Sequence, residues 1–139
     1  MKVFYLILMI NGFLIGYCLG QQTDTMIYTQ PEINPTFQYD TCTNVRSSVK
    51  KYFIDNYKMP TILIDNGYNG SVYLEFVIER DSSISNIKVI RGIHEPLDKS
   101  IIETLKTMPK WIPGINKGKT VRTRFVLPIS IRWLYGKID

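Results

Sequence analysis

The stretch Val121-Arg122-Thr123-Arg124-Phe125-Val126-Leu127-Pro128-Ile129-Ser130-Ile131-Arg132-Trp133 decides the fold. Its odd-numbered positions carry apolar side chains and one Thr, whereas its three arginines all fall on even-numbered positions. Because side chains on a strand alternate between two faces, this pattern predicts a long strand with a core face and a basic face. Pro128 has no N–H to donate, so we expect this strand at a sheet edge with one side free.

Two further β-prone runs precede this strand. Residues 72–79 alternate between apolar and mixed positions, and residues 84–91 follow after the break Arg80-Asp81-Ser82-Ser83. Such close spacing predicts an antiparallel hairpin.

Two amphipathic helices are expected around the hairpin. The first begins after Asn44, a good N-cap, and ends before Pro60. The second has Pro96 in its first turn and is stopped by Pro109. The predicted fold class is α+β, a three-stranded antiparallel sheet with two helices packed on one face.

Composition narrows the function classes. The chain has 139 residues, 45% of them hydrophobic and 21% charged, with a net charge of +5, which is typical of one globular domain and excludes a disordered chain. It holds one His and two Cys, so we expect no metal site and no disulfide scaffold. His94 is the one candidate general base and has no nucleophile beside it in sequence, so we expect no enzyme. Cys42 is expected to be a small, partly buried residue.

Residues 1–20 are expected to be a signal peptide. Lys2 is followed by the uncharged run of residues 3–17, and Cys18-Leu19-Gly20 supplies the small residues that signal peptidase recognises. An uncleaved anchor and a lipoprotein at Cys18 stay open as alternatives. Residues 21–43 are interpreted as an N-terminal segment or short linker, and residues 44–135 as the folded domain.

Three motifs, in this order and spacing, carry a family resemblance. They are Gly70-Ser71-Val72-Tyr73-Leu74-Glu75-Phe76-Val77-Ile78, then Val89-Ile90-Arg91-Gly92-Ile93 with Leu97-Asp98-Lys99, then Met108-Pro109-Lys110-Trp111-Ile112-Pro113-Gly114 with Gly118-Lys119. With them, residues 45–133 resemble the C-terminal domain of TonB-type proteins, especially the copies seen in Bacteroidetes.

The resemblance implies a periplasmic binding module without a cofactor. Its implied partner is a short extended segment of an outer-membrane TonB-dependent receptor, captured by strand addition to support transmembrane transport. Contact with inner-membrane motor proteins and a homodimer stay open. The expected peptide-binding edge is the last strand, with Arg122, Arg124, Val126, Ser130 and Arg132, beside a basic loop with Lys117 and Lys119. Residues 106–139 hold eight basic side chains and one acidic one, so this edge would attract an acidic peptide.

The segment Asp24-Thr25-Met26-Ile27-Tyr28 resembles the TonB box that receptors offer to this domain. It is interpreted first as a β-prone N-terminal strand. A sharper hypothesis is that it pairs with the last strand, within one chain or between two, and blocks the edge.

Two other functions compete with receptor binding. The first is a stand-alone periplasmic adaptor that keeps the fold without energy transduction. If the anchor stays uncleaved, residues 21–43 could extend at most about 80 Å at roughly 3.5 Å per residue, and a tether that short is poorly suited to crossing the periplasm. Nucleic-acid binding would use the basic final third with Trp111, Phe125 and Trp133. Because Phe125 and Trp133 fall on the predicted core face, we expect no nucleic-acid partner.

Overall fold

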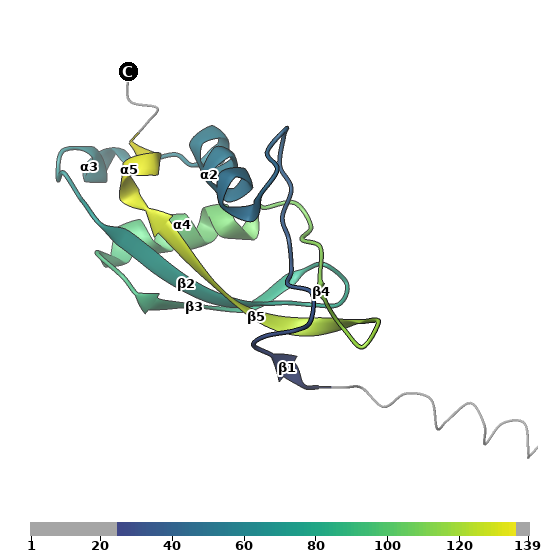
Figure 1. Cartoon of the computed structure of the whole chain (residues 1–139). Coiled ribbons are helices and arrows are strands. Elements are labelled where there is room, and N and C mark those ends of the chain that lie inside the picture. The colour runs from purple at the N-terminus through teal and green to yellow at the C-terminus, as the bar shows by residue number, and fades with distance from the viewer. Residues whose placement is uncertain (1–24, 136–139) are drawn as a thin grey trace, which may run out of the picture.

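The structure is a computed structural model that describes residues 25–135 (Figure 1). In chain order its elements are β1 (Ile27–Tyr28), α2 (Val45–Asn56), α3 (Thr61–Ile64), β2 (Ser71–Ile78), β3 (Ile84–Arg91), α4 (Glu95–Lys106), β4 (Gly114–Asn116), β5 (Lys119–Ser130) and α5 (Ile131–Leu134). The fold is α+β, as the sequence predicts.

The predicted hairpin and last strand form the centre of the sheet. β2 is antiparallel to β3 on one side and to β5 on the other, and its register with β5 runs from Ser71 opposite Ser130 to Ile78 opposite Thr123. The prediction of a three-stranded antiparallel sheet is wrong, however. Within the described residues the sheet is mixed and has five strands, because β1 adds to β5 in parallel and β4 adds to it antiparallel. These two strands are two and three residues long, too short to show a period in sequence.

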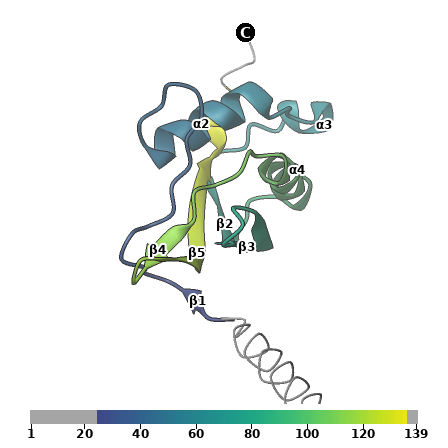
Figure 2. The same cartoon turned by 90° about the vertical axis from the view of Figure 1, so that its right-hand side faces the viewer.

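The two predicted helices are present and end where the sequence indicates. The Asn44 side chain accepts a hydrogen bond of 2.9 Å from the Ser47 N–H at the start of α2, and Pro96 lies in the first turn of α4. Both helices pack on the same face of the sheet (Figures 1 and 2). The described residues add two single-turn helices, α3 and α5.

The last strand ends earlier than its alternation predicts. The chain turns into α5 at Ile131, whose N–H donates to the Gly70 carbonyl at 3.0 Å. Ile131 and Leu134 stay buried, so the apolar pattern continues past the strand because a helical turn also presents them to the core. Arg132 therefore lies on a helix and not on the strand face where we expected it.

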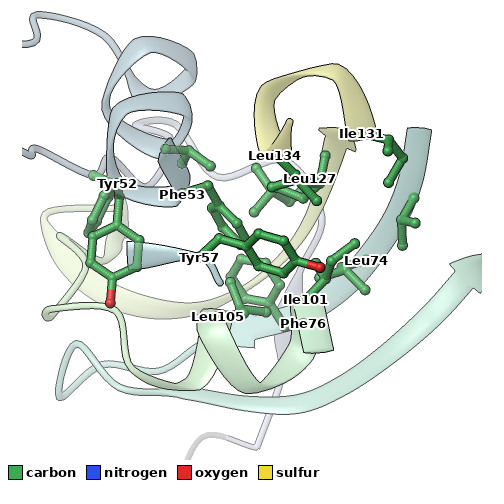
Figure 3. Packing of buried hydrophobic residues seen from close by; sticks show 14 of the residues in the cluster. Tyr52, Phe53, Tyr57, Leu74, Phe76, Ile101, Leu105, Leu127, Ile131 and Leu134 are labelled. Carbon is green, nitrogen blue, oxygen red and sulfur yellow. The ribbon is translucent and has the colours of Figure 1, made fainter. Parts of the chain in front are cut away.

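The core lies between the helices and the inner face of the sheet (Figure 3). Alternate residues of β2 and β5 meet there, with Leu74 opposite Leu127 and Phe76 opposite Phe125. Trp111 is 2% exposed, and its ring centroid lies 5.0–5.5 Å from those of Phe37, Phe76 and Phe125. Burial of these rings is a large hydrophobic contribution to folding.

Part of the segment formed by residues 25–43 reaches the same core. Phe37 is 1% exposed, and the main chain at Ile33 and Thr36 forms bridges with Ile115 and Ile112. The segment before α2 thus helps to hold β4 in place. The expected signal peptide falls outside the described residues. Within residues 25–135, no helix has the length and apolar character needed to span a bilayer.

Candidate peptide-binding site

The expected binding edge is covered over part of its length. On the side that faces away from β2, β1 pairs with β5 in parallel so that Ile27 lies opposite Arg122 and Tyr28 opposite Thr123. β4 pairs with the first residues of β5, Lys119–Val121. β5 is therefore not an edge strand throughout, contrary to the expectation from Pro128. Beyond Thr123 no other strand of the described chain pairs with the side of β5 that faces away from β2. We call residues 125–130, seen from that side, the open edge.

Main-chain groups of the open edge alternate between the two sides of β5. The Ile131 N–H donates to Gly70, which immediately precedes β2, so odd-numbered positions face β2. Pro128 lies opposite Tyr73 in this register without an N–H of its own. Along an antiparallel strand the hydrogen-bonding groups alternate, so those of Val126 and the Pro128 carbonyl face away from β2. The expected role of Pro128 as a sign of a free side is therefore correct for this half of the strand.

A groove of 470 Å³ adjoins the open edge. One wall is the start of α2, the other is β5, and Trp133 of α5 contributes to it. Its lining residues are Val45, Arg46, Val49, Ser71, Tyr73, Phe125, Val126, Leu127, Pro128 and Trp133. We call this the edge groove. Val126 is 46% exposed, so a large part of an apolar side chain beside the groove faces solvent.

Arg122 is bound to its neighbours instead of facing a partner. Its guanidinium donates to the Glu79 carboxylate at 2.7 and 3.0 Å, and its third contact is the Thr25 carbonyl at 3.0 Å. Glu79 also accepts a hydrogen bond from Ser85. The Arg122 hydrogen bonds are the main reason that the pKa of the Glu79 carboxyl lies below its ordinary value of 4.5. Arg122 thus fastens the segment before β1 to the β2–β3 hairpin.

Arg124 lies next to the open edge and has one weak ion pair. Its Nε is 3.9 Å from Glu75 Oε1, and the same oxygen is 3.3 Å from Lys88 Nζ. Two cations share this carboxylate across three strands. Because Arg124 is also 48% exposed, it keeps capacity to attract an acidic partner.

The other predicted site residues are spread out. Lys117 and Lys119 belong to the β4–β5 hairpin, where they line a polar cavity of 470 Å³ with Arg80 and Tyr28. Ser130 ends β5 and forms the N-cap position of α5. Val126 and Ser130 lie on the open edge. Arg122 is paired with β1, and the two lysines lie in the β4–β5 hairpin, outside the open edge.

The TonB-box-like segment is the element that covers β5. Of its five residues, Asp24 lies outside the described range, and Ile27 and Tyr28 form β1. The pairing of this segment with the last strand within one chain is therefore confirmed. It is also an N-terminal strand, so the two interpretations describe the same element.

The remaining candidate residues are His94 and Cys42. His94 is exposed at the N-cap position of α4 and stacks on Tyr68 with ring centroids 5.1 Å apart. Cys42 is half-buried, as expected. No group of three His, Cys, Asp or Glu within this range could hold a metal ion.

The sequence did not predict that the start of α2 forms a wall of the edge groove. Val45 and Val49 belong to the predicted apolar stripe of the first helix, where Val45 stays half-buried. Arg46 lies off that stripe. Because a stripe does not reveal which strand it packs beside, only the order of strands in the sheet places it next to the open edge.

The fold and its edge define a small α+β domain with one strand partly available for pairing. The chain belongs to the Gram-negative bacterial TonB protein C-terminal family, whose model matches residues 56–132, more than half of the sequence.

Two solved structures are similar to it. An NMR solution structure of the Helicobacter pylori TonB C-terminal domain, its residues 194–285, has a TM-score of 0.47 at 20% identity and covers 64% of this chain and 94% of that one. Another, of residues 179–285, has a TM-score of 0.42 at 18% identity and covers 66% of this chain and 87% of that one. None of the curated proteins compared with this chain matches it.

Proposed function

We propose that this protein is a periplasmic binding module that captures a short extended segment of an outer-membrane TonB-dependent receptor by strand addition. Membership of the TonB C-terminal family supports the class of partner. The observation that carries the proposal is the open edge, where Val126 and Pro128 present main-chain groups away from β2. A strand added there gains main-chain hydrogen bonds, and the flanking Arg124 favours an acidic segment.

The test is a calorimetric titration with peptides from receptor plug domains, and in the parent protein the amide resonance of Val126 reports where the peptide binds. Val126→Pro removes one outward-facing donor without removing a hydrogen bond to β2. We expect it to weaken binding at least about tenfold while the midpoint of thermal unfolding changes little. Val126→Thr is the matched control, since it keeps the donor. Equal affinities for all three proteins would refute strand addition at this edge.

Charge reversal tests the electrostatic part. Arg124→Glu should weaken binding of an acidic peptide about threefold to tenfold at low salt and less at high salt. Lys99→Glu changes the charge equally but lies on α4, and should have a smaller effect. Arg122 is a poor choice for this test, because its reversal also breaks the contacts with Glu79 and Thr25.

A second candidate is a stand-alone adaptor that binds a partner without energy transduction. One observation favours it: the main chain at Ile33 and Thr36 bridges to Ile115 and Ile112, and Phe37 is buried in the core, which shortens the tether between the domain and any membrane anchor. Crosslinking in intact cells distinguishes the two. Crosslinks from residues 21–24 to an inner-membrane motor protein are expected for a transducer, and receptor crosslinks alone for an adaptor. The oligomeric state, a homodimer included, is read from sedimentation of the same purified protein.

A further inference from the structure

The edge groove differs in character from the strand edge beside it. Its walls are mainly apolar, with Val45 and Val49 of α2 on one side and Phe125 and Leu127 of β5 on the other. Arg46 is the only charged residue that lines it, and this side chain has no ion pair with the described residues. The groove therefore combines apolar surface with one available positive charge.

The position of the groove relates it to a strand added at the open edge. β1 shows that a segment parallel to β5 fits this side, in a register that places Tyr28 opposite Thr123. Paired residues of neighbouring strands point to the same face of a sheet. The residue of an added strand next to Phe125 would consequently point to the face on which α2 packs, toward the apolar wall.

The wall from α2 also lies outside the part of the chain that the family model matches. That match begins at residue 56, whereas the groove uses Val45, Arg46 and Val49. Main-chain pairing along β5 belongs to the matched region, whereas this wall comes from residues that precede it. It can therefore add side-chain selectivity to a main-chain interaction that has little of its own.

We propose that the edge groove is a side-chain subsite that selects an extended segment with an apolar residue next to Phe125 and an acidic residue two positions after it, because these two side chains point to the same face of the sheet. The apolar side chain is buried between Val45 and β5, and the carboxylate pairs with Arg46. This inference rests on the proposed function, because the segment must first add to the open edge.

The probe is a capped peptide that repeats residues 25–29 and continues with Leu, Thr and Glu. In the register of β1 its Leu lies next to Phe125 and its Glu next to Leu127, so both side chains point to the face on which α2 packs. Two further peptides replace the Leu by Ser or the Glu by Gln. β1 competes with all three peptides equally, so their ratios report the subsite. Calorimetry gives each Kd, and the Val126 amide resonance reports where each peptide binds.

We expect the Leu-to-Ser change to weaken binding about tenfold and the Glu-to-Gln change about threefold. Val45→Trp, which fills the groove, should abolish the preference for Leu, whereas Ile62→Trp on the exposed face of α3 should preserve it. Arg46→Glu should abolish the preference for Glu. Lys50→Glu is its matched control, because this exposed residue of α2 does not line the groove.

The outcomes separate the subsite from the underlying binding. Peptides that shift the Val126 amide with equal affinities would overturn the subsite and leave strand addition intact. No shift of Val126 with any of the three peptides would refute strand addition at the open edge, and the subsite with it.

Discussion

The two strands with an open edge, β3 and β5, differ in how they are protected against unwanted strand pairing. β3 pairs only with β2 and leaves its outer side open over its whole length, but it carries Asn86 at φ 49° and its register with β2 is irregular at two places. Exposed charges at Lys88 and Arg91 line the same strand. Bulges and charges are recognised ways to prevent unwanted strand pairing.

β5 lacks such protection in its second half, whereas its outer side is paired with β1 in its first half. Its register with β2 is continuous over eight pairs, and none of its residues has a positive φ. The comparison shows that the irregular edge of β3 stays open where its geometry resists unwanted strand pairing. The regular edge of β5 is open only beside the apolar edge groove. This difference is the physical argument for placing recognition at β5 and not at β3.

The largest effect should come from disturbing the packing of β4 against β5 at Gly114. A Cβ there would lie 2.5 Å from Thr123 Oγ1, 3.0 Å from Pro31 Cγ and 3.2 Å from the Ile33 carbonyl oxygen. Gly114→Ala should therefore lower the free energy of unfolding by about 1–3 kcal/mol, because β4 and the segment around Ile33 must move away from β5. Urea titration measures the change.

Gly118→Asn serves as the control in the same hairpin. Gly118 has φ 72° and no atom within 4 Å of an added Cβ, and Asn tolerates this backbone region. Its cost should stay below about 1 kcal/mol. If Gly114→Ala cost no more than Gly118→Asn, the close packing around Gly114 would not matter to stability.

Removing β1 should extend the open edge. A deletion of residues 23–28 takes away the segment that pairs with Arg122 and Thr123, so an added receptor peptide no longer competes with it. Because β1 is only two residues long, we expect peptide affinity to rise about threefold to tenfold. Unchanged affinity in a calorimetric titration would show that β1 does not block the edge.

Much of this fold follows from the period of its sequence, and the remainder from contacts that have no period. β2, β3, α2, α4 and most of β5 are regular elements with alternating or helical apolar patterns, and each was predictable. β1 was predictable as a pairing segment only through its likeness to a receptor motif. The pairing of β4 with β5 and the α2 wall of the groove depend on the order of strands in the sheet. The local sequence around residues such as Gly114 and Arg46 does not predict that order. Pro128 indicated a free side of β5 correctly, but it could not show how far along the strand that side is free.

Acidification should weaken the contact of Glu79 with Arg122, which holds the segment before β1. Glu79 binds its proton at a lower pH when folded than when unfolded, so its contribution to stability is complete above the unfolded pKa and is lost as the pH falls through the folded pKa. Below about pH 4 the contact with Arg122, and through it with Thr25, should weaken. We expect a loss of up to about 1 kcal/mol that Glu79→Gln makes independent of pH. Thermal unfolding of both proteins between about pH 6 and 3 measures it, and parallel curves would contradict the assignment.

The smallest change in stability is expected at β3. Substitutions there also give the most direct test of the comparison between the open edges of β3 and β5. Replacing its outer charges with Lys88→Val and Arg91→Val leaves an open strand that also carries Ile90, which is already 52% exposed. Such surface substitutions should change the free energy of unfolding by no more than about 0.5 kcal/mol. If charge protects this edge, sedimentation should reveal association that rises with concentration, whereas Lys99→Val on α4 should stay unchanged. A variant that remains as dispersed as the parent would show that the bulge at Asn86 alone suffices, because it bends the strand away from the flat geometry that a second strand needs.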